Sequence, residues 1–221
     1  MARIIIIANS FRYDGRCIAG IDADTYEVVR PVPSFGDGGV PEARCFIDGK
    51  FIQPLDVIEM DLAKAPRERP KYQRENRTIR NWEWKRLGRV RFSTLEQFVD
   101  QTSPVLHTAS DRVSPVFLDK LDQDQWQSLQ LIQPSRLTFN HHYFQDKRWV
   151  ANFRDSKGND YTLKIADPVV TRLLDAEKEP EKGSLLTVSL PKAWAPKPTP
   201  GEEAKAPMCY KVIAAVIQPP A

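Results

Sequence analysis

Residues 149–165 have the sequence WVANFRDSKGNDYTLKI. Trp149, Ala151 and Phe153 alternate with their neighbours, and alternation resumes at residues 161–165 after a run of Ser, Lys, Gly, Asn and Asp. A period of two is typical of a strand with one buried face, and a short polar break of this kind joins antiparallel strands. We therefore expect a β-hairpin. Its polar face either contacts a ligand or is the solvated face that any small barrel shows.

Further strands are predicted on both sides of this hairpin. Residues 129–132 and 136–139 precede it, and residues 185–190 and 209–217 follow it, all rich in aliphatic side chains. The last two are separated by a proline-rich loop at residues 196–207, which is too polar to join a core. The second half of the chain is thus predicted to be mostly β.

The first half also begins with strands. Residues 3–8 predict a buried strand, residues 17–22 and 26–31 predict a hairpin, and residues 56–62 predict a half-exposed strand. The initial apolar run is only five residues long, too short for a signal peptide core or a membrane span. We expect a cytoplasmic protein with no membrane contact.

The middle of the chain predicts loops and short helices. Residues 64–80 are basic, with scattered prolines, which indicates a loop or surface arm. A capping-box pattern begins at Ser93, and Leu95 and Phe98 give one apolar helical face. A second short helix is expected after Ser114. The fold class is therefore mostly β with short helices, with a domain boundary between residues 118 and 129.

Composition narrows the class of protein. A hydrophobic fraction of 41% with 28% charged residues indicates an ordinary globular chain, and its 221 residues suit either one large β domain or two domains. The three cysteines are far apart and odd in number, which argues against a disulfide framework or a Cys-x-x-Cys metal site. We expect reduced thiols.

The positive charge is concentrated in one stretch, residues 64–91, called here the basic segment. It holds eleven basic residues and three acidic ones, a net charge of +8 on a chain whose total is +3, so the remainder carries −5. Such a block creates a local positive field that attracts polyanions. Nucleic acid is therefore the first partner to consider.

Several ordered blocks together carry a family resemblance. At the front these are Ala8-Asn9-Ser10, residues 15–20 and Arg30-Pro31-Val32, and at the back residues 161–168, 186–190 and 209–217. In these blocks the chain resembles the bacterial dual OB-containing domain family along nearly its whole length. Two features depart from the family pattern: Lys164 where members carry an aromatic residue, and the long proline-rich loop.

The resemblance implies two tandem OB-like small β-barrels. We predict a first barrel at residues 1–125, with a basic arm and a helical insertion, and a second at residues 126–221, with the proline-rich loop. It also implies a prokaryotic protein of nucleic-acid metabolism or defence. The family supplies no catalytic residues.

OB barrels bind single strands by stacking bases on exposed aromatic rings and by following phosphates with Arg and Lys. Trp82 and Trp84 are two residues apart in the basic segment, so on a strand they would share a face. The alternative is that both are core residues inside a solvated basic rim.

Arg30 and Arg16 lie in the family-like blocks and equally suit anchoring a carboxylate such as Asp22 or Asp56. We favour that structural role for Arg30. The predicted nucleic-acid-binding residues are Arg12, Tyr13, Arg16, Arg74, Arg77, Arg80, Trp82, Trp84, Lys85, Arg86, Arg89, Lys147 and Arg148.

Catalytic and metal sites are not indicated. His141 and His142 are adjacent and would point apart on a strand, so we interpret them as a surface pair and not as metal ligands. Cys17 is expected to be a small core residue, and Asp167-Pro168 a helix start or turn. No phosphate-binding glycine loop or nucleophile elbow is present. We expect no cofactor and no enzymatic activity.

Two functions remain open. The leading hypothesis is a sequence-tolerant nucleic-acid binder whose affinity falls with salt. The alternative is an interaction module that docks on an ATPase, nuclease or sensor, with the basic segment meeting an acidic protein partner and the proline-rich loop as a flexible contact.

Overall fold

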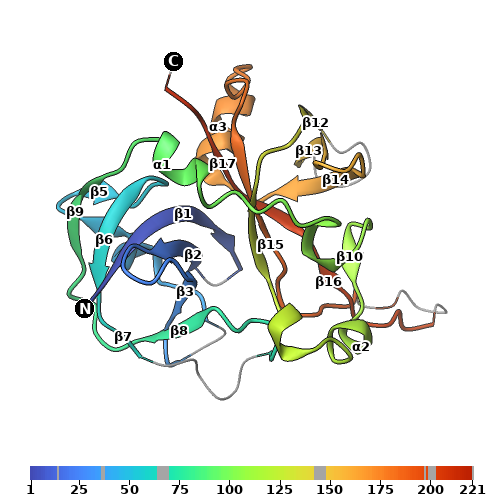
Figure 1. The fold of residues 1–221 in the computed structure, drawn as a ribbon, viewed down its shortest axis with the longest axis horizontal. Coiled ribbons are helices and arrows are strands. Elements are labelled where there is room, and N and C mark those ends of the chain that lie inside the picture. Colours follow the sequence, from blue (N-terminus) through green and yellow to red (C-terminus); the bar gives the residue numbers. More distant parts are fainter. Residues whose placement is uncertain are drawn as a thin grey trace.

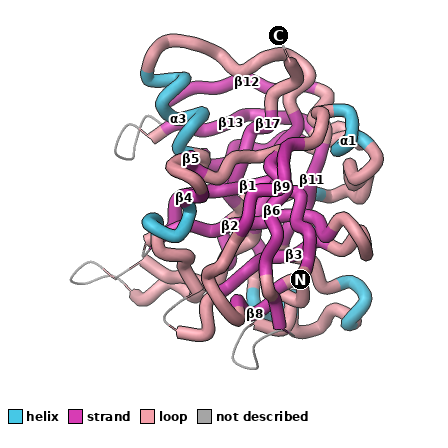
Figure 2. Tube along the Cα trace, turned by 90° about the vertical axis from the view of Figure 1, so that its left-hand side faces the viewer, coloured by secondary structure: helices cyan, strands magenta, loops and turns pink. Residues whose placement is uncertain are grey.

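The computed structural model describes residues 1–13, 15–35, 38–63, 70–141, 148–196, 198 and 203–220. Within them the fold is mostly β, as predicted, and is built on two curled sheets that lie side by side in Figure 1. Helices are short and lie at the periphery (Figure 2). No helix in the described ranges is long and apolar enough to cross a membrane.

The first sheet has the strand order β7-β8-β3-β2-β1-β6-β9. Its strands are β1 (Ala2–Arg12), β2 (Gly15–Asp22), β3 (Val28–Val32), β6 (Asp56–Met60), β7 (Leu62–Ala63), β8 (Asn76–Ile79) and β9 (Lys85–Arg89). A small ribbon of β4 (Phe46–Ile47) and β5 (Lys50–Phe51) follows the 3-10 helix η1 (Glu42–Cys45). The expected hairpin of β2 and β3 and the expected strand β6 are confirmed.

The second sheet has the order β11-β15-β17-β14-β13-β12. Its strands are β11 (Leu129–Ile132), β12 (Arg136–His141), β13 (Trp149–Arg154), β14 (Asp160–Ile165), β15 (Leu185–Ser189) and β17 (Val212–Ile217). A two-stranded sheet of β10 (Arg112–Val113) and β16 (Cys209–Tyr210) lies beside it. The hairpin expected at residues 149–165 is confirmed, with Phe153 opposite Tyr161.

Strand β1 is buried on both faces, which explains its run of isoleucines. Ile4 and Ile6 lie in the core of the first barrel, whereas Ile5 and Ile7 lie in a second cluster shared with residues of β11, β15 and β17. The Thr187 hydroxyl of β15 also donates to the Ile7 carbonyl at 2.7 Å. The two sheets therefore share a continuous apolar junction.

Apart from the eight-residue α3, the described helices are single turns. The α-helices among the described residues are α1 (Ser93–Glu96), α2 (Pro115–Leu118) and α3 (Pro168–Asp175), and η2 (Val105–His107) and η3 (Gln123–Gln125) are 3-10 turns. Asp167 starts α3 as expected, since its carboxylate accepts the N–H groups of Val169 and Val170. The capping box predicted at Ser93 is wrong, because Phe92 occupies the cap position and makes no side-chain cap. Leu95 nevertheless is fully buried.

The basic segment is more ordered than predicted. Residues 64–69 lie outside the described residues, but residues 76–79 form β8, which pairs in parallel with β3. The prediction of a loop there is wrong because β3 has an open edge that this backbone completes. In the chain between the sheets, Val105, Leu106 and Val113 pack into the core of the second barrel. The boundary at residues 125 and 126 stays a prediction.

Candidate nucleic-acid interface

The strand that ends the basic segment is tied to an acidic neighbour. Arg86 Nη1 and Arg89 Nη1 lie 3.0 and 2.6 Å from the carboxylate oxygens of Asp56, which is fully buried. Strands β6 and β9 pair with Asp56 opposite Arg89, so the sheet register itself brings these charges together. A carboxylate without water needs such partners. Arg86 and Arg89 therefore neutralise the buried Asp56 carboxylate in the folded chain.

Other cations of the basic segment are paired across strands in the same way. The N–O distances are 3.8 Å for Lys85 with Glu59, 3.7 Å for Arg80 with Asp61 and 3.1 Å for Arg77 with Glu27. Four acids from outside the segment, Glu27, Asp56, Glu59 and Asp61, therefore offset half of the +8 charge. Nucleic-acid binding by these residues stays a prediction, but their local field is weaker than the sequence indicates.

The two tryptophans of the basic segment lie between β8 and β9, not on a strand. Trp84 is only 8% exposed and belongs to the core of the first barrel. Trp82 is half-buried, lies 5.4 Å from Trp84 between ring centroids, and carries the Arg44 guanidinium 5.6 Å from its own ring centroid. Trp84 is therefore a core residue, and Trp82 offers one partly open face.

Arg30 is a buried structural residue, as favoured from the sequence. Its Nη1 lies 2.9 Å from Glu75, and its Nη2 donates to the Ser128 carbonyl at 3.2 Å and the Ser189 hydroxyl at 3.4 Å. The partner is Glu75, not Asp22 or Asp56 as considered from the sequence. Asp22 instead accepts N–H groups of its own turn.

Arg16, one of the predicted nucleic-acid-binding residues, is buried as well. Its guanidinium carbon lies 4.6 Å from the Phe11 ring centroid and 4.8 Å from that of Phe51, with Glu42 at 3.6 Å. Tyr13, in contrast, is fully exposed, and Arg12 ends β1 nearby. The first barrel thus presents aromatic rings around a sequestered cation.

The remaining predicted residues are dispersed. Arg74 is exposed and donates to the main-chain carbonyls of Gln123 and Asp124. Arg148 is exposed at the start of β13, and Lys147 lies outside the described residues. The predicted set therefore does not converge on one surface.

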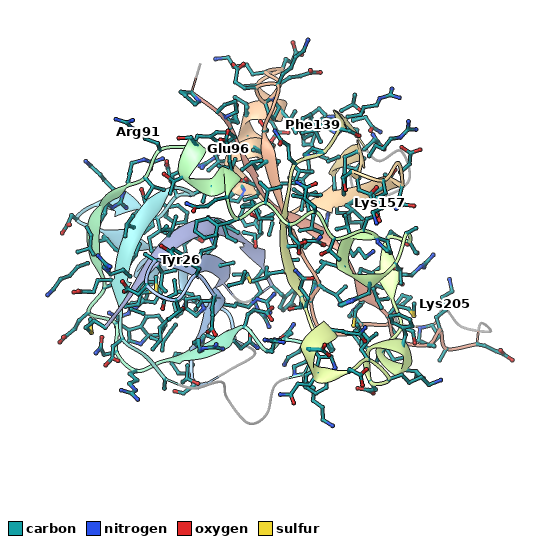
Figure 3. All side chains as sticks on the ribbon, in the orientation of Figure 1. Tyr26, Arg91, Glu96, Phe139, Lys157 and Lys205 are labelled. Atoms are coloured by element: carbon teal, nitrogen blue, oxygen red, sulfur yellow. The ribbon has the colours of Figure 1, made fainter. Side chains whose placement is uncertain are left out.

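A different surface does combine aromatic rings and cations. Between the second sheet and the proline-rich loop lies a hollow of about 620 Å³, which we call the Trp194 groove. Val150, Thr162 and Lys164 of β13 and β14 line its sheet side, while Trp194, just before the proline-rich loop, and Lys205, within it, line the other side. Figure 3 shows Lys205 on the part of the chain that projects from the body.

Backbone pairing fixes the aromatic residues of this groove. Trp194 and Met208 exchange two main-chain hydrogen bonds of 2.9 and 3.0 Å, so the two ends of the proline-rich loop are clamped together. Tyr210, two residues after Met208, consequently lies beside Trp194, with 6.1 Å between ring centroids. Trp194 is 61% exposed, although a tryptophan usually buries most of its surface.

The Trp194 groove is bordered by exposed cations. Arg112 lies over the Tyr210 ring at 5.7 Å, and Lys164, Lys192 and Lys205 complete the exposed cations. The acid of the groove is Asp111, whose carboxylate lies 3.2 Å from Arg112. Exposed cations beside open aromatic rings suit an anionic chain.

Lys211 also borders the groove but has a structural task. Its buried Nζ donates to the carbonyls of Val105 and Ser110, each at 2.7 Å, and to Thr108. Burial lowers the pKa of Lys211 to about 8. This lysine therefore fastens the segment after η2 to the second barrel.

The sequence carries one signal for this groove. Trp194 lies in a polar, proline-rich stretch with Lys192 close by, where no core is available for an indole ring. Such a tryptophan is expected on the surface. Its pairing with Tyr210 and Arg112 depends on the tertiary bridge to Met208 and could not be predicted.

The polar face of the hairpin adjoins the groove. Thr162 donates to Asn152 at 2.8 Å, and Asn152 donates in turn to Asn140, so one row crosses β14, β13 and β12. Arg154 and Asp160 form a two-bond pair, each bond 2.8 Å. The face is therefore polar and nearly neutral outside the groove.

The histidines do not gather at a metal site. His107 Nε2 is 2.8 Å from the Gln127 carbonyl, and the His141 ring lies 3.8 Å from that of Trp149, while His142 is outside the described residues. In the ranges that the structure covers, no three His, Cys, Asp or Glu side chains form a group that could hold a metal ion. All three cysteines are free thiols.

The two adjoining curled sheets agree with the family that a comparison of the sequence with known protein families identifies. A family model described as the dual OB-containing domain matches residues 2–216. The chain belongs to this family. The resemblance predicted from the sequence is thereby confirmed, and the two sheets of this dual OB protein are its OB-like barrels. Searches of curated proteins and of solved structures found no match.

Proposed function

We propose that this dual OB protein is a non-catalytic nucleic-acid-binding protein that holds a single strand in the Trp194 groove. The observation that carries the proposal is the exposed Trp194 ring beside Tyr210, bordered by four exposed cations. In this groove, open aromatic faces and exposed cations lie together among the described residues. A prokaryotic defence setting and a cytoplasmic location stay predictions.

The chemistry of the groove suits a single strand of any sequence. Every base has a π-face, so stacking on Trp194 or Tyr210 tolerates all four bases and contributes about 1–3 kcal/mol per base. Arg112 and the lysines would contact phosphates without reading sequence. A duplex keeps its bases stacked inside and would offer only its phosphates. We therefore expect a preference for single strands.

Fluorescence anisotropy with labelled single-stranded and duplex oligonucleotides tests this proposal. We expect saturable binding of single strands that weakens steeply as salt rises, because bound phosphates release counterions. Trp194→Ala should weaken binding about 5- to 150-fold, the equivalent of one stacked base. Lys205→Gln should weaken it and reduce the salt dependence.

Lys85→Gln is the matched control, since it removes the same charge from the paired strand β9, next to Glu59. It should leave affinity within about 2-fold of wild type, as expected for an exposed, compensated charge. The proposal fails if no oligonucleotide binds in a salt-sensitive way at micromolar protein, or if Trp194→Ala binds as well as wild type.

The first barrel favours a second candidate function, docking on a protein partner. Phe11 and Phe46 are 56% and 51% exposed, and Tyr13 is fully exposed near them. Exposed aromatic side chains that cluster on one barrel are typical of interaction surfaces. Because Arg12, Arg44 and Lys50 lie in the same segments, the partner expected here has an acidic surface. Co-purification from the native host that is lost in Phe11→Ser, with oligonucleotide binding intact, would support this function.

A further inference from the structure

A buried ammonium group borders the Trp194 groove and binds one short segment of chain. Lys211 lies between β16 and β17 and is only 2% exposed. Its Nζ donates to the carbonyls of Val105 and Ser110, each at 2.7 Å, to the Thr108 carbonyl, and to the Thr108 hydroxyl at 3.1 Å. We call these four oxygen atoms the oxygen cage. An ammonium group donates only, so a cage of acceptors suits its charged form.

The groups around the oxygen cage are consistent with a charged lysine at neutral pH. Burial lowers the pKa of Lys211 to about 8, while the Asp111 carboxylate favours the charged form. The Tyr161 ring centroid lies 5.2 Å from Nζ, and burial raises the pKa of this tyrosine to about 12. Burial lowers the pKa of His107, so this ring is neutral at pH 7. The ammonium form of Lys211 therefore fills the cage near pH 7.

The oxygen cage is connected directly to Arg112 of the groove. The Thr108 hydroxyl, which accepts from Lys211, donates in turn to the Arg112 carbonyl at 3.1 Å. The main-chain N–H of Lys211 donates to the Asp111 carbonyl at 2.8 Å. Arg112 then pairs with Tyr210 across β10 and β16, which lie side by side in Figure 1, so the two side chains share a face. The Arg112 guanidinium lies 5.7 Å from the Tyr210 ring centroid.

We propose that Lys211 is a positioning residue of the Trp194 groove: by filling the oxygen cage, it holds Arg112 over Tyr210, where the guanidinium can contact a phosphate of the bound strand. This inference rests on the strand binding proposed above. Lys211 is too deeply buried to contact the strand itself. Its effect on binding therefore passes through Arg112.

The segment that forms the oxygen cage contains a strained turn. Leu106 and His107 have φ angles of 43° and 79°, which side chains of this size rarely adopt. The Lys211 ammonium binds main-chain oxygens on both sides of this turn, at Val105 before it and at Thr108 and Ser110 after it. Such strain persists only where surrounding groups maintain it. Without the ammonium, the turn can relax and the position of Arg112 changes with it.

NMR spectroscopy of the full chain without a ligand tests the positioning directly. The Arg112 Nε–H signal, identified by its loss in Arg112→Gln, depends on the Asp111 carboxylate 3.2 Å from Nε and on the ring current of Tyr210. Lys211→Met keeps most of the apolar stem but removes the ammonium. We expect it to move the Arg112 signal toward that of an unstructured peptide. An unchanged signal in folded Lys211→Met overturns the proposal.

Fluorescence anisotropy with a single-stranded oligonucleotide at pH 7 then measures the consequence for binding. Arg112→Gln should weaken binding about 5-fold, as expected for one lost phosphate contact. Lys211→Met should weaken it about 3- to 5-fold, because Arg112 is present but displaced. The double variant should bind at most about 1.5-fold more weakly than Arg112→Gln alone, because Lys211 acts through Arg112. Multiplied effects in the double variant, or wild-type affinity in Lys211→Met, contradict this role.

Arg30→Met is the matched control for a general loss of stability, since it removes a buried cation from β3 of the first barrel. Well below its melting temperature it should keep the Arg112 signal and bind strands within about 2-fold of wild type. If it moves the Arg112 signal as much as Lys211→Met does, the effect is not specific and the proposal fails.

Thr108→Val is a milder variant that removes only the hydroxyl between Lys211 and Arg112. It should move the Arg112 signal in the same direction as Lys211→Met but less far, and it decides the question if Lys211→Met does not fold. Failure of the proposed function is seen separately. If wild type binds no oligonucleotide, strand binding is refuted, whereas the Arg112 signal still shows whether Lys211 positions this side chain.

Discussion

The Arg30 guanidinium forms a buried ion pair in the first barrel and donates hydrogen bonds across the junction, so its loss should be strongly destabilising. Arg30 on β3 binds Glu75, which precedes β8, and reaches across the junction to the Ser128 carbonyl and the Ser189 hydroxyl. The Arg30 and Glu75 side chains are only 5% and 6% exposed. Arg30→Met keeps much of the length and apolar surface but leaves the Glu75 carboxylate without its cation. Removing one partner of a buried pair costs about 3–5 kcal/mol.

That loss is a large part of the total, because domains are stable by only about 5–15 kcal/mol. For a chain of this size it corresponds to a decrease in melting temperature of about 6–20 °C. Urea titration followed by tryptophan fluorescence measures it directly as a lower midpoint. Far-ultraviolet circular dichroism at zero urea shows whether the variant is still folded.

Two further variants make the measurement decisive. Arg80→Met removes an exposed arginine 3.7 Å from Asp61 and should cost less than about 1 kcal/mol. Arg30→Met with Glu75→Gln removes both charges and should be more stable than the sum of the single changes, since no lone buried charge remains. Our reasoning is refuted if Arg30→Met costs no more than Arg80→Met, or if the two changes are additive.

Other parts of the second and first barrels give measurable expectations. Burial raises the pKa of Asp155, but hydrogen bonds from Asn159 and Ser103 outweigh this and lower it to about 2. The ionised Asp155 therefore stabilises the fold above its ordinary pKa of 3.8, and this stabilisation is lost as the pH falls toward 2. Between pH 5 and 2, the free energy of unfolding of wild type should fall by about 1–2 kcal/mol more than that of Asp155→Asn, measured by urea titration. Equal losses in the two proteins would contradict this expectation. In the first barrel, a Cβ on Gly20 would lie 2.2 Å from Ile4 Cγ2 and 2.7 Å from the Ile5 carbonyl oxygen. Gly20→Ala should therefore cost about 1–3 kcal/mol by overpacking, seen as a lower melting temperature, and an unchanged value would show that β1 and β2 can separate.

Local patterns predicted the strands whose burial is visible in the sequence. The hairpin of β13 and β14 has a clear period of two, and the isoleucines of β1 are all apolar because both faces of that strand are buried. Strand β8 was missed because its residues are mostly polar or charged and its pairing with β3 is parallel and distant in sequence. The single-turn α1 was recognised by Leu95, but its cap was not, since an N-cap is set by backbone angles at Phe92.

The site was predicted less well than the fold, for a physical reason. A count of charges along the chain assigns the basic segment a large field, but electrostatic energy depends on distance in space. Glu27, Asp56 and Glu59 lie outside that segment and are brought to it by the register of β6 with β9 and by the position of β8. The aromatic residues of the groove could not be predicted for the opposite reason, because Trp194 and Tyr210 are far from any charge cluster in the sequence.

This difference suggests how the two barrels divide their tasks. In the first barrel, arginines near the sheet edge satisfy buried or half-buried acids, so they stabilise the fold whether or not a ligand is bound. In the second barrel, Lys205 and Arg112 surround aromatic rings that the fold itself does not bury. Charges that already stabilise the folded state have less to gain from an added polyanion than charges that face solvent. We therefore expect a strand to bind more favourably at the Trp194 groove than at the basic segment, even though the basic segment contains more arginines.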